Sequence, residues 1–154
     1  MTGSADRVPA AILAAARRVA EAAGPTDAAA GIIAVGWATV ELDRAQAELA
    51  PLVPGPWTDA SRDALLGAAV RLGPELTPGG PRLVLLEPDT EGRLAASLAR
   101  RGEGVAAVYV ARVADGPVPG DARWSSIAAG PLGPGRLRLG PIAGPHLVAL
   151  VSPG

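Results

Sequence analysis

Few residues in this chain of 154 carry side chains suited to catalysis. There is one histidine, His146, and there is no cysteine, which excludes disulfides and thiolate chemistry. A Ser-His-acid triad would need His146, yet no serine stands in a recognisable nucleophile motif. Glu87 and Arg112 each end a predicted strand and could serve as an acid–base or anion-holding group, although solvation at the surface is the commoner fate. The sequence has no phosphate loop, dinucleotide fingerprint or nucleophile elbow.

Composition narrows the class of protein. Hydrophobic residues make up 49% of the chain, but there is no Phe, so Ala, Val, Leu and Ile must build the core. The net charge of -1 disfavours a nucleic-acid partner, which needs a basic face. No apolar run approaches the roughly 20 residues that span a bilayer, and no secretion signal opens the chain. We therefore expect a cytoplasmic protein without a membrane partner, and the all-arginine basic set is typical of a GC-rich bacterial genome.

Hydrophobic periodicity predicts alternating helices and strands. An amphipathic helix is expected at 8–23, ended by Gly24-Pro25, with packing against the domain as its main role and partner binding as the alternative. Apolar runs predict strands at 31–40, 64–72, 83–87, 105–113, 136–139 and 146–151. Two further helices are expected at 41–49 and 91–101, and 57–62 is expected to be a polar turn. The two halves look like versions of one small unit.

Two segments, 34–45 with its Val-Glu-Leu-Asp-Arg and 83–104 with its Leu-Leu-Glu-Pro and Gly-Glu-Gly, resemble the vicinal oxygen chelate superfamily, in particular its methylmalonyl-CoA epimerase and glyoxalase branch. Residues 34–45 read Ala-Val-Gly-Trp-Ala-Thr-Val-Glu-Leu-Asp-Arg-Ala, which is similar to the family's opening strand and its acidic–Leu–Asp signature. Residues 83–88, Leu-Val-Leu-Leu-Glu-Pro, lead through a helix to Gly102-Glu-Gly104 and an apolar strand, as in the middle of family members. The resemblance covers about residues 31–113.

The resemblance implies an α+β fold in which paired βαβββ modules form a curved mixed sheet around a cavity. Residues 1–30 would then be an additional N-terminal helical extension, and 31–154 the sheet domain. Within that domain we expect module one at about 31–88, a linker helix at 89–102 and module two at about 103–154.

Family members hold a divalent metal through side chains from four strands, and the resemblance places those positions on Ala34, Val84, Ala107 and, less securely, Ala149. None of these side chains offers an oxygen or imidazole donor. His146 stands three residues before Ala149, so strand alternation predicts that it points to the opposite face. We therefore expect no metal and no other cofactor.

Strand alternation then predicts an apolar cavity floor that carries one phenol. Tyr109 shares the parity of Ala107, and its alternative role is that of a core tyrosine hydrogen-bonded to the backbone. Trp57 and Trp124 stand in Pro/Gly-rich loops, where each could cap the cavity or pack on the sheet rim, whereas Trp37 has the parity of the helix-packed face. The expected ligand-binding residues are Tyr109, Trp57, Trp124, Ala34, Val84 and Ala107.

Three functions follow from this reading of the sequence. The favoured one is a metal-free protein that binds a small, largely apolar molecule for sequestration or transport, as a homodimer that completes the cavity between chains, which the resemblance to antibiotic-sequestering members allows. The second is a cofactor-free isomerase, cyclase or lyase using Tyr109, Glu87 or Arg112, and a dry carboxylate beside Tyr109 would favour it. The third is a structural or interaction protein whose cavity has collapsed. No catalytic residue is identified from the sequence.

Overall fold

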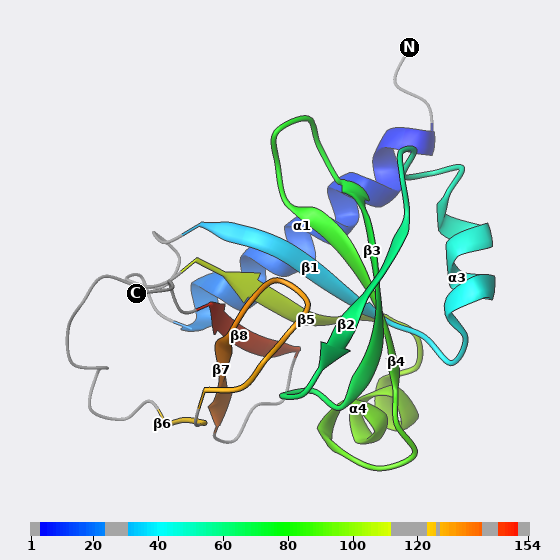
Figure 1. Cartoon of the computed structure of the whole chain (residues 1–154). Helices are drawn as coiled ribbons and strands as arrows, with labels where there is room; N and C mark the ends of the chain where they lie inside the picture. The colour runs from blue at the N-terminus through cyan, green and yellow to red at the C-terminus, as the bar shows by residue number, and fades with distance from the viewer. Residues whose placement is uncertain (1–3, 24–30, 112–122, 126, 140–144, 151–154) are drawn as a thin grey trace.

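The computed structural model describes residues 4–23, 31–111, 123–125, 127–139 and 145–150 (Figure 1). Three helices and eight strands lie in these ranges. In chain order they are α1 (Ser4–Ala23), β1 (Ile32–Ala38), α3 (Leu42–Leu49), β2 (Thr58–Asp63), β3 (Ala68–Glu75), β4 (Arg82–Pro88), α4 (Arg93–Arg101), β5 (Gly104–Val110), β6 (Arg123–Trp124), β7 (Gly135–Leu139) and β8 (His146–Leu150). None of these helices is long and apolar enough to cross a membrane.

The strands form one curled mixed sheet in the order β2-β3-β4-β1-β5-β8-β7-β6, with the two-residue β6 pairing only with β7. In the first half β4 returns to lie parallel to β1, and in the second half β8 returns to lie parallel to β5. The two halves meet where β1 and β5 pair in antiparallel orientation. This arrangement confirms the predicted α+β fold with a curved sheet built from two similar halves.

The sheet separates two clusters of buried side chains. The outer face is covered by α1 and α3: α1 lies over β1, β5 and β8, while α3 contacts β4 (Figure 1). Ile12 and Ala16 of α1 pack there against Val35 and Val108 of the sheet, which confirms the expected packing role of this amphipathic helix. The inner face carries the second cluster, to which α4 contributes Leu94.

A strand replaces the polar turn expected at 57–62. β2 is the edge strand, and it pairs with β3 through Thr58 opposite Leu72 and Asp59 opposite Arg71. Its sequence, Thr-Asp-Ala-Ser-Arg-Asp, is polar and mostly exposed, so it lacks the apolar alternation that marks a half-buried strand. β3 starts at Ala68, later than the expected 64, because a turn occupies 64–67.

Carboxylates from distant strands hold the start of α3. The side chain of Glu41, the residue that precedes the helix, makes no capping hydrogen bond. Instead, Glu87 Oε1 of β4 accepts a hydrogen bond from the backbone N–H of Leu42 at 3.1 Å. Glu103, the acidic residue of the Gly-Glu-Gly segment, accepts one from the N–H of Val40 at 3.0 Å. The Gly-Glu-Gly segment therefore anchors the junction between β1 and α3.

Candidate functional site

Backbone pairing aligns the inner-face residues in rows across the four central strands. One row consists of Val84, Gly36, Ala107 and His146, and the adjacent row contains Ala34, Tyr109 and Val148. Ala34, Val84 and Ala107 are each 0% exposed and belong to the same cluster as Tyr109. The structure thus brings together four of the six residues expected to contact a ligand, and it covers all four from solvent.

The polar centre of the inner face is a hydrogen-bonded pair, Asp63 and Tyr109. The phenol of Tyr109 donates a hydrogen bond to Asp63 Oδ2 at 2.6 Å, and both side chains are 1% exposed. Asp63 Oδ1 accepts two more hydrogen bonds, from the backbone N–H groups of Leu65 and Leu66, each at 2.9 Å. One carboxylate therefore fixes both the β2–β3 turn and the phenol of β5.

Asp63 was not among the site residues predicted from the sequence. An aspartate that begins a turn and accepts from N–H groups two and three residues later is a common turn motif, and Asp63-Ala-Leu-Leu-Gly67 fits it. That pattern identifies the turn but not the partner, because Tyr109 stands 46 residues away.

The environment of the pair keeps the phenol protonated. Burial raises the pKa of Tyr109 well above its ordinary value, and both the negative charge of Asp63 and the hydrogen bond to it raise this pKa further. General acid–base catalysis works best with a pKa near the working pH. The raised pKa makes Tyr109 a poor general acid or base near neutral pH. Its hydroxyl oxygen can still accept a hydrogen bond.

Segments from both halves of the chain meet over the inner face. We call residues 63–67 the closing turn. The backbone N–H of Ala64 donates to the carbonyl of Ala129 at 3.2 Å, and a Cβ placed on Gly130 would lie 3.9 Å from Asp63 Oδ2. Leu66 of the closing turn and Leu132 of the facing segment both pack on the inner cluster. These contacts bring the closing turn and the facing segment together over the inner cluster.

His146 lies on the inner side of the sheet, which corrects the sequence-based expectation. Val148 belongs to the inner cluster and Ala149 packs on the outer one, so the proposed alignment of Ala149 with a metal-ligand position is wrong by one residue. Alternation then puts His146 on the same side as Val148, beside Ala107 in the strand pairing. A one-residue slip in register exchanges the two faces of a strand.

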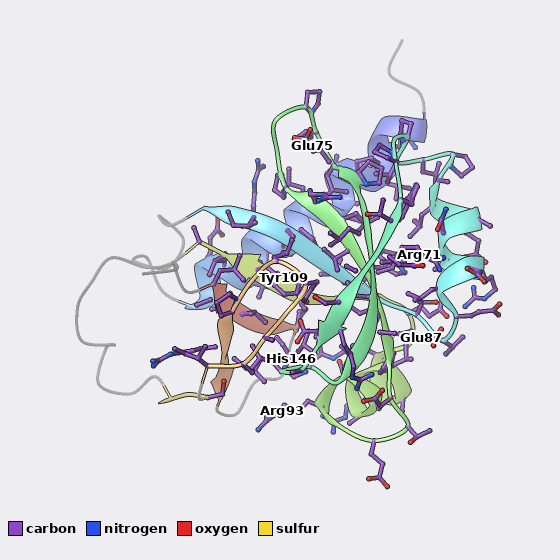
Figure 2. All side chains as sticks on the ribbon, in the orientation of Figure 1. Arg71, Glu75, Glu87, Arg93, Tyr109 and His146 are labelled. Carbon is purple, nitrogen blue, oxygen red and sulfur yellow. The ribbon has the colours of Figure 1, made fainter. Side chains whose placement is uncertain are left out.

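The imidazole of His146 has no hydrogen-bond partner in the described part of the chain, although both ring nitrogens are buried. Burial lowers its pKa, and the positive charges of Arg93 and Arg101 on α4 lower it further. The main chain of Arg93 lies close enough to oppose this shift without completing a hydrogen bond. Figure 2 shows Arg93 next to His146, below Tyr109. His146 is therefore a neutral imidazole near pH 7, with one donor and one acceptor.

Trp57 packs on the outer side of the sheet, which agrees with the second of its two expected roles, packing on the sheet, rather than with covering the cavity. It packs against the outer cluster and over Gly73 of β3, where an added Cβ would come within 2.7 Å of its ring. Its indole Nε1 is buried and lacks a partner among the described residues. Trp37 also packs on the outer cluster, as its parity predicts.

Among the remaining candidates, the structure places only the side chain of Glu87, and it does not join the inner face. Glu87 is held at the start of α3, and its neighbour Leu86 rather than Glu87 faces the inner cluster. The backbone of Trp124 belongs to β6, but its side chain lies outside the described residues, as does all of Arg112. Across the described ranges, no three His, Asp or Glu side chains are grouped so that they could hold a metal ion.

No protein-family model and no curated protein sequence matches this chain. Solved structures do. Methylmalonyl-CoA epimerase from Mycobacterium tuberculosis superposes with a TM-score of 0.60 at 18% identity, covering 79% of this chain and 89% of the epimerase. A hypothetical protein from Bacillus halodurans gives 0.57 at 15% identity, covering 77% of this chain and 91% of that one.

A variant of Streptomyces coelicolor methylmalonyl-CoA epimerase, solved in complex with 2-nitronate-propionyl-CoA, gives a TM-score of 0.56 at 18% identity, with 79% of this chain and 95% of the epimerase covered. Identities this low support a shared architecture and leave activity open. The chain has the glyoxalase-like fold of the vicinal oxygen chelate superfamily, to which the methylmalonyl-CoA epimerases belong.

Proposed function

We propose that this protein binds a small, largely apolar molecule at the inner face of its sheet, without a metal ion. The observation that carries the proposal is the composition of that face: an apolar wall that retains three polar side chains, Asp63, Tyr109 and His146. Small-molecule sites typically combine apolar walls with a few polar groups of this kind. Asp63 and Tyr109 satisfy each other, whereas a core with a purely structural role gains nothing from burying an imidazole such as that of His146, which lacks a partner in the described chain.

In this proposal the described structure is the closed form. Ala34, Val84 and Ala107 would form the floor under the ligand, with Tyr109 at its side, but all are now covered. Entry therefore requires the closing turn to move away from the segment that contains Ala129. A backbone hydrogen bond contributes about 1 kcal/mol net, so the Ala64–Ala129 bond alone is a small barrier to opening.

Binding in the role of sequestration or transport fits better than catalysis, because the proton of Tyr109 is held by Asp63. The epimerase reaction named for the structural neighbours fits this chain poorly, since the side chains of Ala34, Val84 and Ala107 have no oxygen or nitrogen atom that could bind a metal ion. We further propose a cytoplasmic homodimer in which residues 1–30 extend a sheet domain at 31–154. Light scattering after size-exclusion chromatography tests the dimer directly.

The test of the binding proposal is a thermal-shift screen of the full chain against aromatic and aliphatic small molecules, followed by equilibrium dialysis of the hits. A ligand at 100 times its Kd stabilises the folded protein by about 2.7 kcal/mol, which raises the Tm by several degrees. Ala107→Leu should weaken binding at least tenfold by filling the floor, while exposed Val40→Ala should not. A screen without hits, for a protein that stays folded, would favour the collapsed-cavity alternative.

A second candidate is a cofactor-free isomerase, cyclase or lyase. The observation in its favour is the dry carboxylate of Asp63 in contact with the phenol of Tyr109. Such an enzyme would convert a bound ligand, and Tyr109→Phe would abolish turnover while binding persisted. Mass spectrometry of the ligand recovered after long incubation distinguishes the two candidates, because a binding protein returns it unchanged.

A further inference from the structure

His146 is the one side chain of the inner face whose polar atoms have not found partners in the described chain. Both ring nitrogens are buried, whereas Asp63 and Tyr109 satisfy each other. Buried polar atoms in folded proteins are nearly always hydrogen-bonded, and exceptions call for an explanation. Trp57 Nε1 shares this state, but it lies on the outer side and offers a single donor.

The charges that act on His146 are positive. They belong to Arg93 and Arg101, both on α4, and no carboxylate of the described chain adds to them. A neutral imidazole in such a field presents its N–H to an acceptor, and the nearby guanidinium groups favour an acceptor that carries negative charge. The local chemistry therefore suits an anionic oxygen.

The position of His146 connects it to the proposed site. Its strand pairing puts it beside Ala107, in the row that also contains Gly36 and Val84. A molecule that rests on this floor reaches the imidazole at one end of the row. Its apolar body would lie against Ala107 and Val84, and its polar end would meet His146 and the neighbouring Arg93.

We infer that His146 is the hydrogen-bonding anchor for the carboxylate of an apolar monocarboxylic acid bound on the inner face, with Arg93 supplying attraction at the rim. The inference rests on the proposed binding function and names the class of its ligand. It also gives a reason for a neutral histidine to remain in an otherwise apolar row.

The experiment uses the fact that the chain has a single histidine. Its ¹³C–¹H imidazole signals therefore report on His146 without assignment. The full-length protein is titrated with octanoate and cinnamate, and separately with their methyl esters, at pH 7. We expect each acid to bind at least tenfold more tightly than its ester, to shift the imidazole signals and to raise the pKa of His146, because a bound carboxylate stabilises the imidazolium.

Two variants separate anchoring from a structural role. His146→Leu should weaken binding of the acid at least tenfold and binding of the ester, whose carbonyl accepts only a weaker hydrogen bond, by less than about threefold, a contrast that loss of the fold could not produce. Arg93→Gln should weaken acid binding about threefold and reduce its salt dependence. If acid and ester bind equally and the histidine signals stay still, the anchor is overturned while the binding function stands. If neither the acids nor the esters bind, the anchor is overturned, and the binding function fails with it only if the thermal-shift screen also yields no ligand.

Discussion

The two faces of the sheet are equally buried and differ in chemistry. The outer cluster consists of aliphatic side chains under α1 and α3, with Trp37 and Trp57 at its margins. Charged groups on that side stay at the periphery, as in the ion pairs of Arg71 with Asp43 and Asp59. The inner cluster is just as apolar at its floor, but it encloses a carboxylate, a phenol and, beside them, an imidazole.

This difference distinguishes the face that only stabilises the fold from the face to which we assign ligand binding. Apolar packing under helices suffices to hold a sheet in place, so the outer face needs no internal polar group. The inner face keeps polar groups that a structural core could replace. Asp63 and Tyr109 contribute to stability through their hydrogen bonds, whereas His146 contributes none that the described structure contains. Substitutions on the two faces should therefore differ in the size of their effect on stability, and at His146 also in its sign.

The largest effect is expected on the outer face. Leu85→Ala leaves a cavity at a residue that is 0% exposed, and such losses cost about 2–5 kcal/mol of unfolding free energy. Urea denaturation measures the change, and ligand affinity should persist wherever the variant remains folded. Val40→Ala, at a residue 63% exposed, is the matched control with a change below about 0.5 kcal/mol. A cost below 1 kcal/mol for Leu85→Ala would show that the outer cluster is not the main core.

Asp63→Ala comes next, at about 3 kcal/mol, because three hydrogen bonds to one buried carboxylate are lost together. Asp63→Asn keeps an acceptor for the N–H groups of Leu65 and Leu66 and should cost less than half as much. Hydrogen exchange of the closing turn should accelerate in both variants, more strongly in the alanine form. Equal costs for the two would mean that the turn does not depend on the hydrogen bonds that the N–H groups of Leu65 and Leu66 donate to the residue 63 side chain.

Tyr109→Phe should cost about 1–2 kcal/mol, since it leaves Asp63 Oδ2 without its donor. The stabilisation that Tyr109 contributes depends on pH. The folded-state pKa of Tyr109 lies above the unfolded value, so its stabilisation is complete below about pH 10 and is lost as the pH rises through the folded-state pKa. The single tyrosine allows direct titration by absorbance, and tyrosinate appearing near pH 10 in the folded protein would contradict the buried pair.

The smallest effect, and the opposite sign, is expected for His146→Leu. Removing an unpartnered imidazole should leave stability at pH 7 unchanged or raise it by up to about 1 kcal/mol. The folded-state pKa of His146 is lowered, so wild-type stability should fall as the pH drops below about 6.5, because the unfolded chain then binds the proton first. The variant should lack that part of the decline. A marked destabilisation at pH 7 would reveal a structural partner for the imidazole.

Local patterns in the sequence account for much of this comparison. Alternation along β1, β4 and β5 correctly put Ala34, Val84, Ala107 and Tyr109 on one face and Trp37 on the other, because side chains in a strand alternate regardless of context. Alternation only fixes relative positions, however. In β8 the starting point was misplaced by one residue, and the assigned faces of His146 and Ala149 were exchanged.

What the sequence left unpredicted depends on contacts between distant segments. β2 is a polar edge strand, so its existence rests on pairing with β3 rather than on its own pattern. Asp63 and Tyr109 come from opposite halves of the chain, and nothing near either residue signals the other. The same holds for Glu87 and Glu103, which looked like a solvated acid and a motif residue but serve the start of α3.

The packing position of α1 affects how the chain folds during synthesis. The helix opens the described sequence, yet it packs on β5 in the middle of the chain and on β8 near its far end. During synthesis β1 follows the helix directly, but β5 and β8 emerge much later, and contacts between such remote segments form slowly. The parts of the apolar stripe that pack on β5 and β8 therefore wait for their partners during most of translation, which makes α1 a segment on which a chaperone would act early.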